Sequence, residues 1–219
     1  MFFANTLTYL ARQSIYDREG NLFAYELLFR DSMSTEAVIQ DDLFATMQVL
    51  ENSQSDPDFL KTLGEHKVFV NCSREALLSE IPMKLDSKRF VLEILENVAA
   101  DEAVLKVVRE CHARGLEFAL DDVVFTPEKI KEQEAFFPYV TYAKMDLILN
   151  SAEARAASVS FFKEKGIRVL AEKVETEKEY RDCLREGFNY FQGFFLAKPE
   201  LIIGQKTEIE AFVETEGSV

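Results

Sequence analysis

The chain has few of the residues from which zinc sites and disulfide frameworks are built. It contains two histidines, His66 and His112, and three widely spaced cysteines, Cys72, Cys111 and Cys183, with no CxxC motif. Zinc sites need such residues in clusters, so this composition argues against one. Scattered cysteines in odd number are typical of reduced thiols, and we therefore expect a cytoplasmic protein.

Basic residues and long apolar runs are also scarce. Lysine and arginine number 25 against 39 acidic residues, which gives a net charge of −14. This balance argues against binding to DNA or to an anionic membrane surface, and it means that an anionic ligand would need a cation as mediator. No run of 18 apolar residues occurs, and the N-terminus lacks a signal-peptide pattern, so no membrane association is expected. Hydrophobic residues still make up 47% of the chain, enough for a globular core.

Short apolar segments recur along the chain, and most of them end in a polar or charged residue. These endings lie 20 to 45 residues apart. The segments are LFAYELLFR, KVFVN, RFVLEILE, FALDD, VTYAKMD, RVLAE and YFQGF, and their polar residues are Glu26, Asn71, Glu93, Glu96, Asp121, Asp122, Lys144, Asp146, Glu172 and Gln192. We interpret each segment as a buried strand.

Segments with helical periodicity separate these strands. They cover residues 41–53, 101–115, 151–166 and 177–187, and the last three end in a glycine that can cap a helix. Alternation of strand and helix predicts repeated βα units. An additional strand over 7–17, joined to the next by a turn at 17–21, begins the series. We therefore predict an α/β fold, a modified TIM-like (β/α)8 barrel with an antiparallel first strand, as a single domain over 1–205 with a C-terminal tail over 206–219.

In such a barrel the C-terminal ends of the parallel strands meet at one rim, where active sites are built. Carboxylates and one amide gathered there, without histidine, are the ligands preferred by Mg²⁺ or Mn²⁺. Two alternatives remain open from the residues alone. Each polar ending can be a solvated loop residue, and Asp121 with Asp122 can form the N-cap of a helix over 126–133.

Seven motifs in one order resemble the EAL domains, the cyclic di-GMP phosphodiesterases. They are YELLFR, VFVNCS, VLEILE, LDD, AKMD, AEKVET and YFQGFFLAKP, and the resemblance covers about residues 9–199. AEKVE and the DD stretch without glycines most resemble the EAL half of EAL–HDOD proteins. Only about twenty residues follow Pro199, so we expect no HDOD domain within these 219 residues.

The resemblance implies a role for each matching residue. It assigns the metal ligands Glu26, Asn71, Glu93, Asp121 and Asp122 and the catalytic residues Lys144, which orients the attacking water, and Glu172. It further assigns Arg30 and Gln192 to the substrate and gives Glu96, Asp146 and Glu175 supporting roles. The implied cofactor is Mg²⁺ or Mn²⁺ in a two-metal site, and the implied reaction opens cyclic di-GMP to pGpG.

The segment after the DD pair departs from the family pattern. It reads Val123-Val124-Phe125-Thr126, where most active EAL domains have Phe-Gly-Thr-Gly, and two valines restrict the backbone that glycines leave free. Lys173 also replaces a glycine, with a solvent-facing side chain as the simplest interpretation. Two hypotheses follow: a metal-dependent phosphodiesterase that is slow, with the second metal weakly held, or an inactive EAL domain that acts as a cyclic di-GMP receptor or protein-interaction module. Since this segment supports dimers in the family, we expect a weak homodimer or a monomer, with a protein partner in a signalling pathway.

Overall fold

The computed structural model describes residues 6–30 and 63–207, and the side chains of residues 11–28 and 63–201. The helix expected over 41–53 lies outside the described residues. The strands are β1 Thr6–Asp17, β2 Leu22–Arg30, β3 Lys67–Cys72, β4 Phe90–Ile94, β5 Glu117–Leu120, β6 Tyr142–Asp146, β7 Arg168–Glu172, β8 Tyr190–Phe191 and β9 Glu200–Thr207. The helices are α3 Arg74–Leu78, α4 Glu102–Ala113, α5 Pro127–Gln133, α6 Ala152–Glu164 and α7 Glu177–Glu186, with short 3-10 turns at Pro82–Lys84 and Glu134–Phe136.

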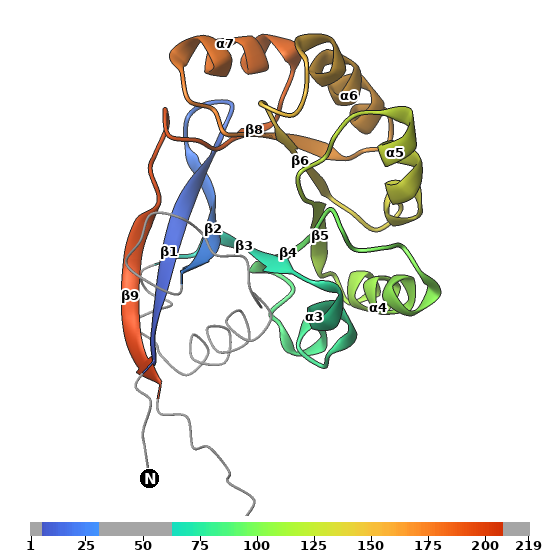
Figure 1. The fold of residues 1–219 in the computed structure, drawn as a ribbon, viewed down its shortest axis with the longest axis vertical. Helices are drawn as coiled ribbons and strands as arrows, with labels where there is room; N and C mark the ends of the chain where they lie inside the picture. Colours follow the sequence, from blue (N-terminus) through green and yellow to red (C-terminus); the bar gives the residue numbers. More distant parts are fainter. Residues whose placement is uncertain (1–5, 31–62, 208–219) are drawn as a thin grey trace, which may run out of the picture.

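The first eight strands close into a barrel. Strands β2 to β8 are parallel and follow one another in chain order, while β1 pairs antiparallel with both β2 and β8 and so closes the ring (Figure 1). This confirms the predicted barrel with its antiparallel first strand. The turn between β1 and β2 is held by Asp17, whose carboxylate accepts hydrogen bonds from the backbone N–H of Glu19 and Asn21. Gly20 supplies the positive φ of 79° that this turn requires.

A ninth strand was not predicted. β9 pairs antiparallel along β1, on the side away from β2, and the two run together in Figure 1. Arg12 on β1 also forms an ion pair of 3.1 Å with Glu200 on β9. The strand extends to Thr207, beyond the predicted boundary at residue 205. This strand forms by pairing with a segment that is distant in the sequence, so a local sequence pattern does not predict it.

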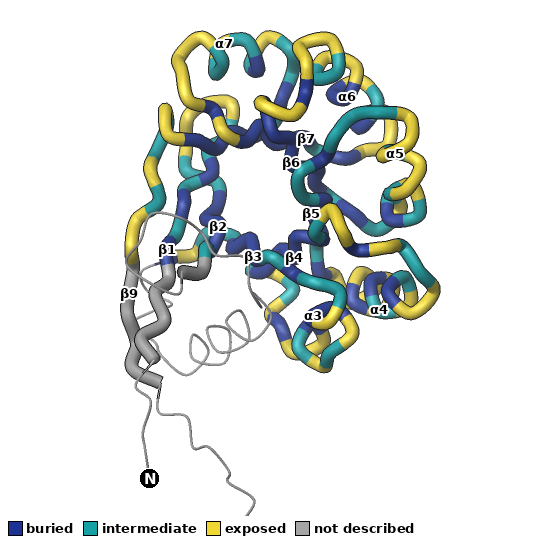
Figure 2. Tube along the Cα trace, in the orientation of Figure 1, coloured by how far each residue is buried: buried dark blue, intermediate teal, exposed yellow. Residues whose placement is uncertain are grey.

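The helices cover the outside of the barrel, with their apolar sides against the strands and their outer sides exposed (Figure 2). Helices α4, α6 and α7 match the predicted segments, and each is followed by a glycine with positive φ, at Gly115, Gly166 and Gly187. Thr126 caps α5 by accepting a hydrogen bond from the Lys129 N–H. The structure thus gives the cap to Thr126, and the alternative interpretation of the Asp pair as an N-cap is wrong.

The interior of the barrel contains a layer of apolar side chains to which all eight strands contribute. Its members pack on one another across the barrel, where the Phe69 ring and the adjoining, partly buried Phe23 ring contact the Tyr142 ring. They are Ile15, Ala24, Phe69, Val91, Ala119, Tyr142, Leu170 and Tyr190. Below this layer, at the N-terminal ends of the strands, Glu117 forms ion pairs with Lys67 and Arg168. The barrel is therefore filled by the apolar layer and by the ion pairs below it, which leaves the C-terminal rim for chemistry.

Candidate active site

A polar layer lies directly above the apolar one. Because successive side chains of a strand point to opposite faces, the residue two positions from each apolar member points to the same interior. For the seven parallel strands this is the second residue toward the C-terminus, and for antiparallel β1 it is the second toward the N-terminus. The eight residues are Gln13, Glu26, Asn71, Glu93, Asp121, Lys144, Glu172 and Gln192. Seven of them were predicted from their place at strand ends, and the structure brings these seven to one rim.

Lys144 on β6 lies at the centre of this layer and contacts β2, β4, β7 and the residue that follows β5. Its side chain is only 1% exposed. The Lys144 Nζ atom lies 2.6 Å from Glu93 Oε1, 2.9 Å from Asp121 Oδ1, 3.0 Å from Glu172 Oε1 and 3.2 Å from Glu26 Oε1. One ammonium group therefore faces four carboxylates, which leaves this part of the site strongly negative.

Burial and mutual repulsion shift the acidity of this group of residues. Burial raises the pKa of Glu93 well above its ordinary value, and the charges of Glu26, Asp121 and Glu172 add to the effect. Burial likewise raises the pKa of Glu172 to about 8, although Lys144 opposes the shift. Burial opposes the charge on Lys144, but its four carboxylates outweigh it and raise the pKa of the amine well above its usual range. The site therefore favours additional positive charge, whether protons or cations.

Gln192 links the polar layer to β1. Its Nε2 atom donates to Glu26 Oε2 at 2.5 Å and to Gln13 Oε1 at 3.2 Å. Gln13 in turn donates from Nε2 to the Ala197 carbonyl, 3.2 Å away, and all three side chains are buried. Gln13 thus fixes the orientation of Gln192, and it is the member of the layer that the sequence analysis missed. Its distance of two residues from Ile15 is the signal that would have found it.

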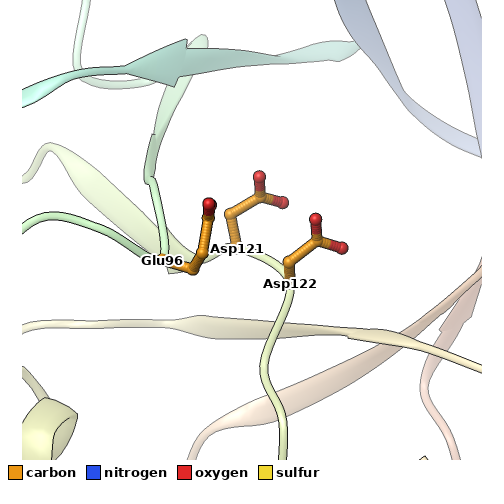
Figure 3. Close-up of side chains that lie close together, drawn as sticks. All are labelled: Glu96, Asp121 and Asp122. Atoms are coloured by element: carbon orange, nitrogen blue, oxygen red, sulfur yellow. The ribbon is translucent and has the colours of Figure 1, made fainter. Parts of the chain in front are cut away.

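Asp122 and Glu96 stand beside Asp121 at the outer edge of the site (Figure 3). One carboxylate oxygen from each of the three lies within 4.8 Å of the others, close enough to bind one ion. Asp122 has a φ of 42°, which turns its side chain to the same side as that of Asp121. Burial and the neighbouring Asp121 raise the pKa of Asp122.

Asp146 is buried at the end of β6, in register with Glu172 on β7. Its Oδ1 atom accepts a hydrogen bond of 2.6 Å from the Ile148 N–H, and its Oδ2 atom forms an ion pair with Lys173. Lys173 follows Glu172 directly and has a φ of 57°. Its side chain is half exposed, but its amine is directed back to the site by Asp146 and does not simply face solvent.

The remaining predicted site residues are Asn71, Glu175 and Arg30. Asn71 is in register with Glu93 across β3 and β4, and its Oδ1 atom is buried without a hydrogen-bond partner. Glu175 is exposed, and its backbone N–H donates to Glu179 at the start of α7. Arg30 ends β2, and its side chain lies outside the described side chains.

Residues 123–126, which follow the Asp pair and depart from the family pattern, are packed into the protein. Val123 is fully buried, and Phe125 contacts the rings of Phe161 and Phe162 on α6. Asn150 accepts a hydrogen bond from the Phe125 N–H at 2.9 Å and donates to the Val123 carbonyl at 2.9 Å. Residues 123–126 therefore form an apolar, hydrogen-bonded connection to α5.

The donor set suits a hard divalent cation. All candidate ligand atoms are carboxylate or amide oxygens. Asn71 Oδ1 is buried without a hydrogen-bond partner among the described residues, and a cation would satisfy it. We take Glu26, Asn71, Glu93 and Asp121 as candidate ligands of one ion and Asp121 with Asp122 as candidate ligands of a second, with Glu96 beside them.

The described helices include none that is both long and apolar enough to span a membrane.

A family model described as the EAL domain matches residues 4–199. The cyclic di-GMP phosphodiesterase CdgJ of Vibrio cholerae is 32% identical over 198 residues, which are 89% of this chain and 45% of that protein. The chain spans slightly less than half of the length of the curated relatives it matches.

Solved structures share the fold. The YkuI protein of Bacillus subtilis, in complex with cyclic di-GMP and calcium, superposes with a TM-score of 0.68 at 21% identity over 91% of this chain and 56% of that one. BlrP1 of Klebsiella pneumoniae, in complex with manganese and cyclic di-GMP, gives 0.66 at 19% identity over 91% of this chain and 60% of that one. With its barrel, its ordered motifs and this family match, the chain belongs to the EAL domain family.

Proposed function

We propose that this domain is a metal-dependent phosphodiesterase that hydrolyses cyclic di-GMP to linear pGpG. The observation that carries the proposal is the buried lysine, Lys144, surrounded by Glu26, Glu93, Asp121 and Glu172 at the rim of the barrel. Such a concentration of buried charge costs stability unless ligands or ions compensate it, and it is typical of functional sites. The name of CdgJ and the ligands of the two solved structures indicate the same substrate.

Divalent cations are central to this proposal, with Mg²⁺ or Mn²⁺ as the expected ions. Glu26, Asn71, Glu93 and Asp121 would hold one ion, and Asp121 with Asp122 would hold the other. When bound, such ions lower the pKa of an attacking water and neutralise the charge that develops on the phosphodiester. They also let a chain with a net charge of −14 bind a doubly anionic dinucleotide.

The chain's own residues would divide the remaining work. Lys144, fixed by its carboxylates, would donate a hydrogen bond to the attacking water and hold it in line with the scissile bond. Glu172, whose Oε2 atom is buried without a hydrogen-bond partner among the described residues, would take the water's proton once it is ionised. Gln192 is hydrogen-bonded to Gln13 and Glu26, which fix its orientation, and it would contact the substrate. Arg30 would bind a phosphate oxygen.

The reaction balances with these groups. The water oxygen forms a bond to phosphorus, the bond between phosphorus and the 3′ oxygen breaks, and the 3′ oxygen leaves with the electron pair and takes a proton from solvent. One ring-opening of this kind gives pGpG with a terminal 5′-phosphate. The water's proton passes to Glu172 and then to solvent.

The test is incubation with cyclic di-GMP and Mn²⁺, followed by chromatography for pGpG. We expect turnover that depends on Mn²⁺ and falls by about 10²–10⁴-fold in Lys144→Met, because the positioned water is lost. Lys178→Met is the matched control, since Lys178 is an exposed residue of α7 that pairs with Asp182. Absence of pGpG from the unchanged protein at enzyme concentrations of tens of micromolar would contradict the proposal.

A second candidate function is that of an inactive cyclic di-GMP receptor or protein-interaction module. The packed segment 123–126 favours it, because Val123 and Phe125 hold the backbone beside Asp122 in place. Calorimetry with cyclic di-GMP and Ca²⁺ separates the two, since tight binding without turnover in Mn²⁺ identifies a receptor.

The assembly proposal, a monomer or weak homodimer, is tested by light scattering across a concentration series. The free, buried Cys72, Cys111 and Cys183 agree with a cytoplasmic location.

A further inference from the structure

Two residues other than glycine have positive φ in the described part of the chain, and both border the candidate site. They are Asp122, with a φ of 42°, and Lys173, with a φ of 57°. A side chain in this left-handed conformation is strained relative to glycine. Lys173 has neither the short polar side chain of Asp nor the freedom of Gly, so its conformation needs a compensating contact.

The compensating contact is the ion pair between Lys173 and Asp146. The carboxylate of Asp146 is 2% exposed, and its second oxygen already accepts the Ile148 N–H. Lys173 therefore supplies the counter-charge of a buried carboxylate. Its own side chain remains 51% exposed, so the amine is held at the mouth of the site and not within its core.

Lys144 and Lys173 have different direct partners at the site. Lys144 contacts Glu26, Glu93, Asp121 and Glu172 directly, whereas Lys173 contacts Asp146 and interacts electrostatically with Asp122. Asp122 follows β5 and Asp146 ends β6, two neighbouring strands, and the Val123 N–H donates to the Lys144 carbonyl at 2.9 Å, which holds the segment after β5 against β6. Lys173 is therefore the direct partner of Asp146, while Lys144 is the direct partner of the central carboxylates.

We propose that Lys173 is a tethered cation that weakens the second divalent-metal site, the one formed at Asp121 and Asp122, while leaving the first site unaffected. This inference rests on the metal dependence of the proposed function. A fixed positive charge beside Asp122 repels an incoming divalent ion and lowers the net negative charge that attracts it. Lys173 therefore sets how many metal ions the domain holds at a given metal concentration.

The test is titration of the nucleotide-free protein with Mn²⁺, followed by calorimetry and by electron paramagnetic resonance of free Mn²⁺. Lys173→Asn removes the charge and keeps a residue that tolerates positive φ. We expect it to tighten the weaker Mn²⁺ site by about tenfold or more, which corresponds to about 1.4 kcal/mol, with the tighter site unchanged. Lys173→Gly should do the same, and Lys173→Arg, which keeps the charge, should leave both sites as they are.

The controls separate this role from a structural one. Lys178→Asn removes an exposed lysine of α7 and should leave both sites unchanged. Thermal unfolding in EDTA reports whether the loss of the Asp146 partner disturbs the fold. An unchanged or weaker second site in both Lys173→Asn and Lys173→Gly would overturn the proposal and would show that Lys173 only supports Asp146. Because no nucleotide is present, the outcome is independent of whether the domain hydrolyses cyclic di-GMP.

Discussion

Individual side chains at the rim follow from one rule, the period of two along each strand. Every inward apolar residue is followed by an inward polar one toward the rim, as Phe69 is by Asn71 and Val91 by Glu93. Polar strand endings therefore predicted seven of the eight members. Gln13 was not predicted because its strand runs in the opposite direction, so that the N-terminal part of this strand lies at the rim. The contacts of Lys144 and Lys173 could not be predicted, since they join strands that are distant in sequence.

Glu26 offers the cleanest test of metal binding. Mn²⁺ at about 100 times its dissociation constant should stabilise the native protein by about 2.7 kcal/mol through mass action, a rise of roughly 5–10 °C in Tm for a chain of this size. Glu26→Gln should abolish this gain, because Glu26 is buried among the candidate ligands. Glu128→Gln, an exposed change at the start of α5, serves as the control. A full metal-dependent shift in Glu26→Gln would refute the assignment.

Acidity at the site predicts the pH dependence of stability without metal. The pKa of Glu172 is about 8 in the folded state against an ordinary value of 4.5, so the folded protein retains a proton that the unfolded chain loses as pH rises. Stability in EDTA should therefore fall between about pH 4.5 and pH 8, by a few kcal/mol at most. Urea unfolding at several pH values measures this. Glu172→Gln should flatten the profile, and an identical slope in the variant would place the effect elsewhere.

At the scale of elements, local chemistry accounts for most of the agreement with the sequence. The hairpin turn at 17–21, the glycines after α4, α6 and α7, and the alternation of strand and helix are all determined by neighbouring residues. Strand β9 depends on pairing with β1, and segment 123–126 depends on Asn150 and the rings of α6. Such tertiary determinants leave no periodic trace in the sequence.

Asn150 holds segment 123–126 in place. Besides its two hydrogen bonds to this segment, its Nδ2 atom donates to the Asp146 carbonyl at 3.0 Å, and the residue is buried. Asn150→Ala should cost about 2–4 kcal/mol, because it leaves buried backbone groups without partners. Urea denaturation measures the cost, with exposed Asn97→Ala as the matched control. Hydrogen exchange should quicken at Phe125, and an unaltered rate there would show that aromatic packing alone fixes the segment.

At the scale of the whole molecule, the barrel separates stability from chemistry along its axis. The N-terminal end is closed by Glu117, which pairs with Lys67 and Arg168, while the Arg168 guanidinium lies 4.4 Å from the centre of the Tyr142 ring. The C-terminal end has the opposite character, since its carboxylates outnumber its lysines and are compensated only in part. The apolar layer lies between the two ends, so we expect each end to be independent of the other.

Glu117→Ala tests this separation. The substitution leaves Lys67 and Arg168 without their partner and removes the acceptor of a hydrogen bond of 3.5 Å from the Tyr142 hydroxyl. We expect a loss of roughly 1–3 kcal/mol, less than for a fully buried pair because these side chains are partly exposed. Exposed Glu110→Ala on α4 should be nearly neutral. Calorimetry of the folded Glu117→Ala protein should give the same Mn²⁺ dissociation constants as the parent chain. A change of tenfold or more would mean that the two ends are coupled through the apolar layer, and that the carboxylate cluster depends on the closure of the barrel at its opposite end.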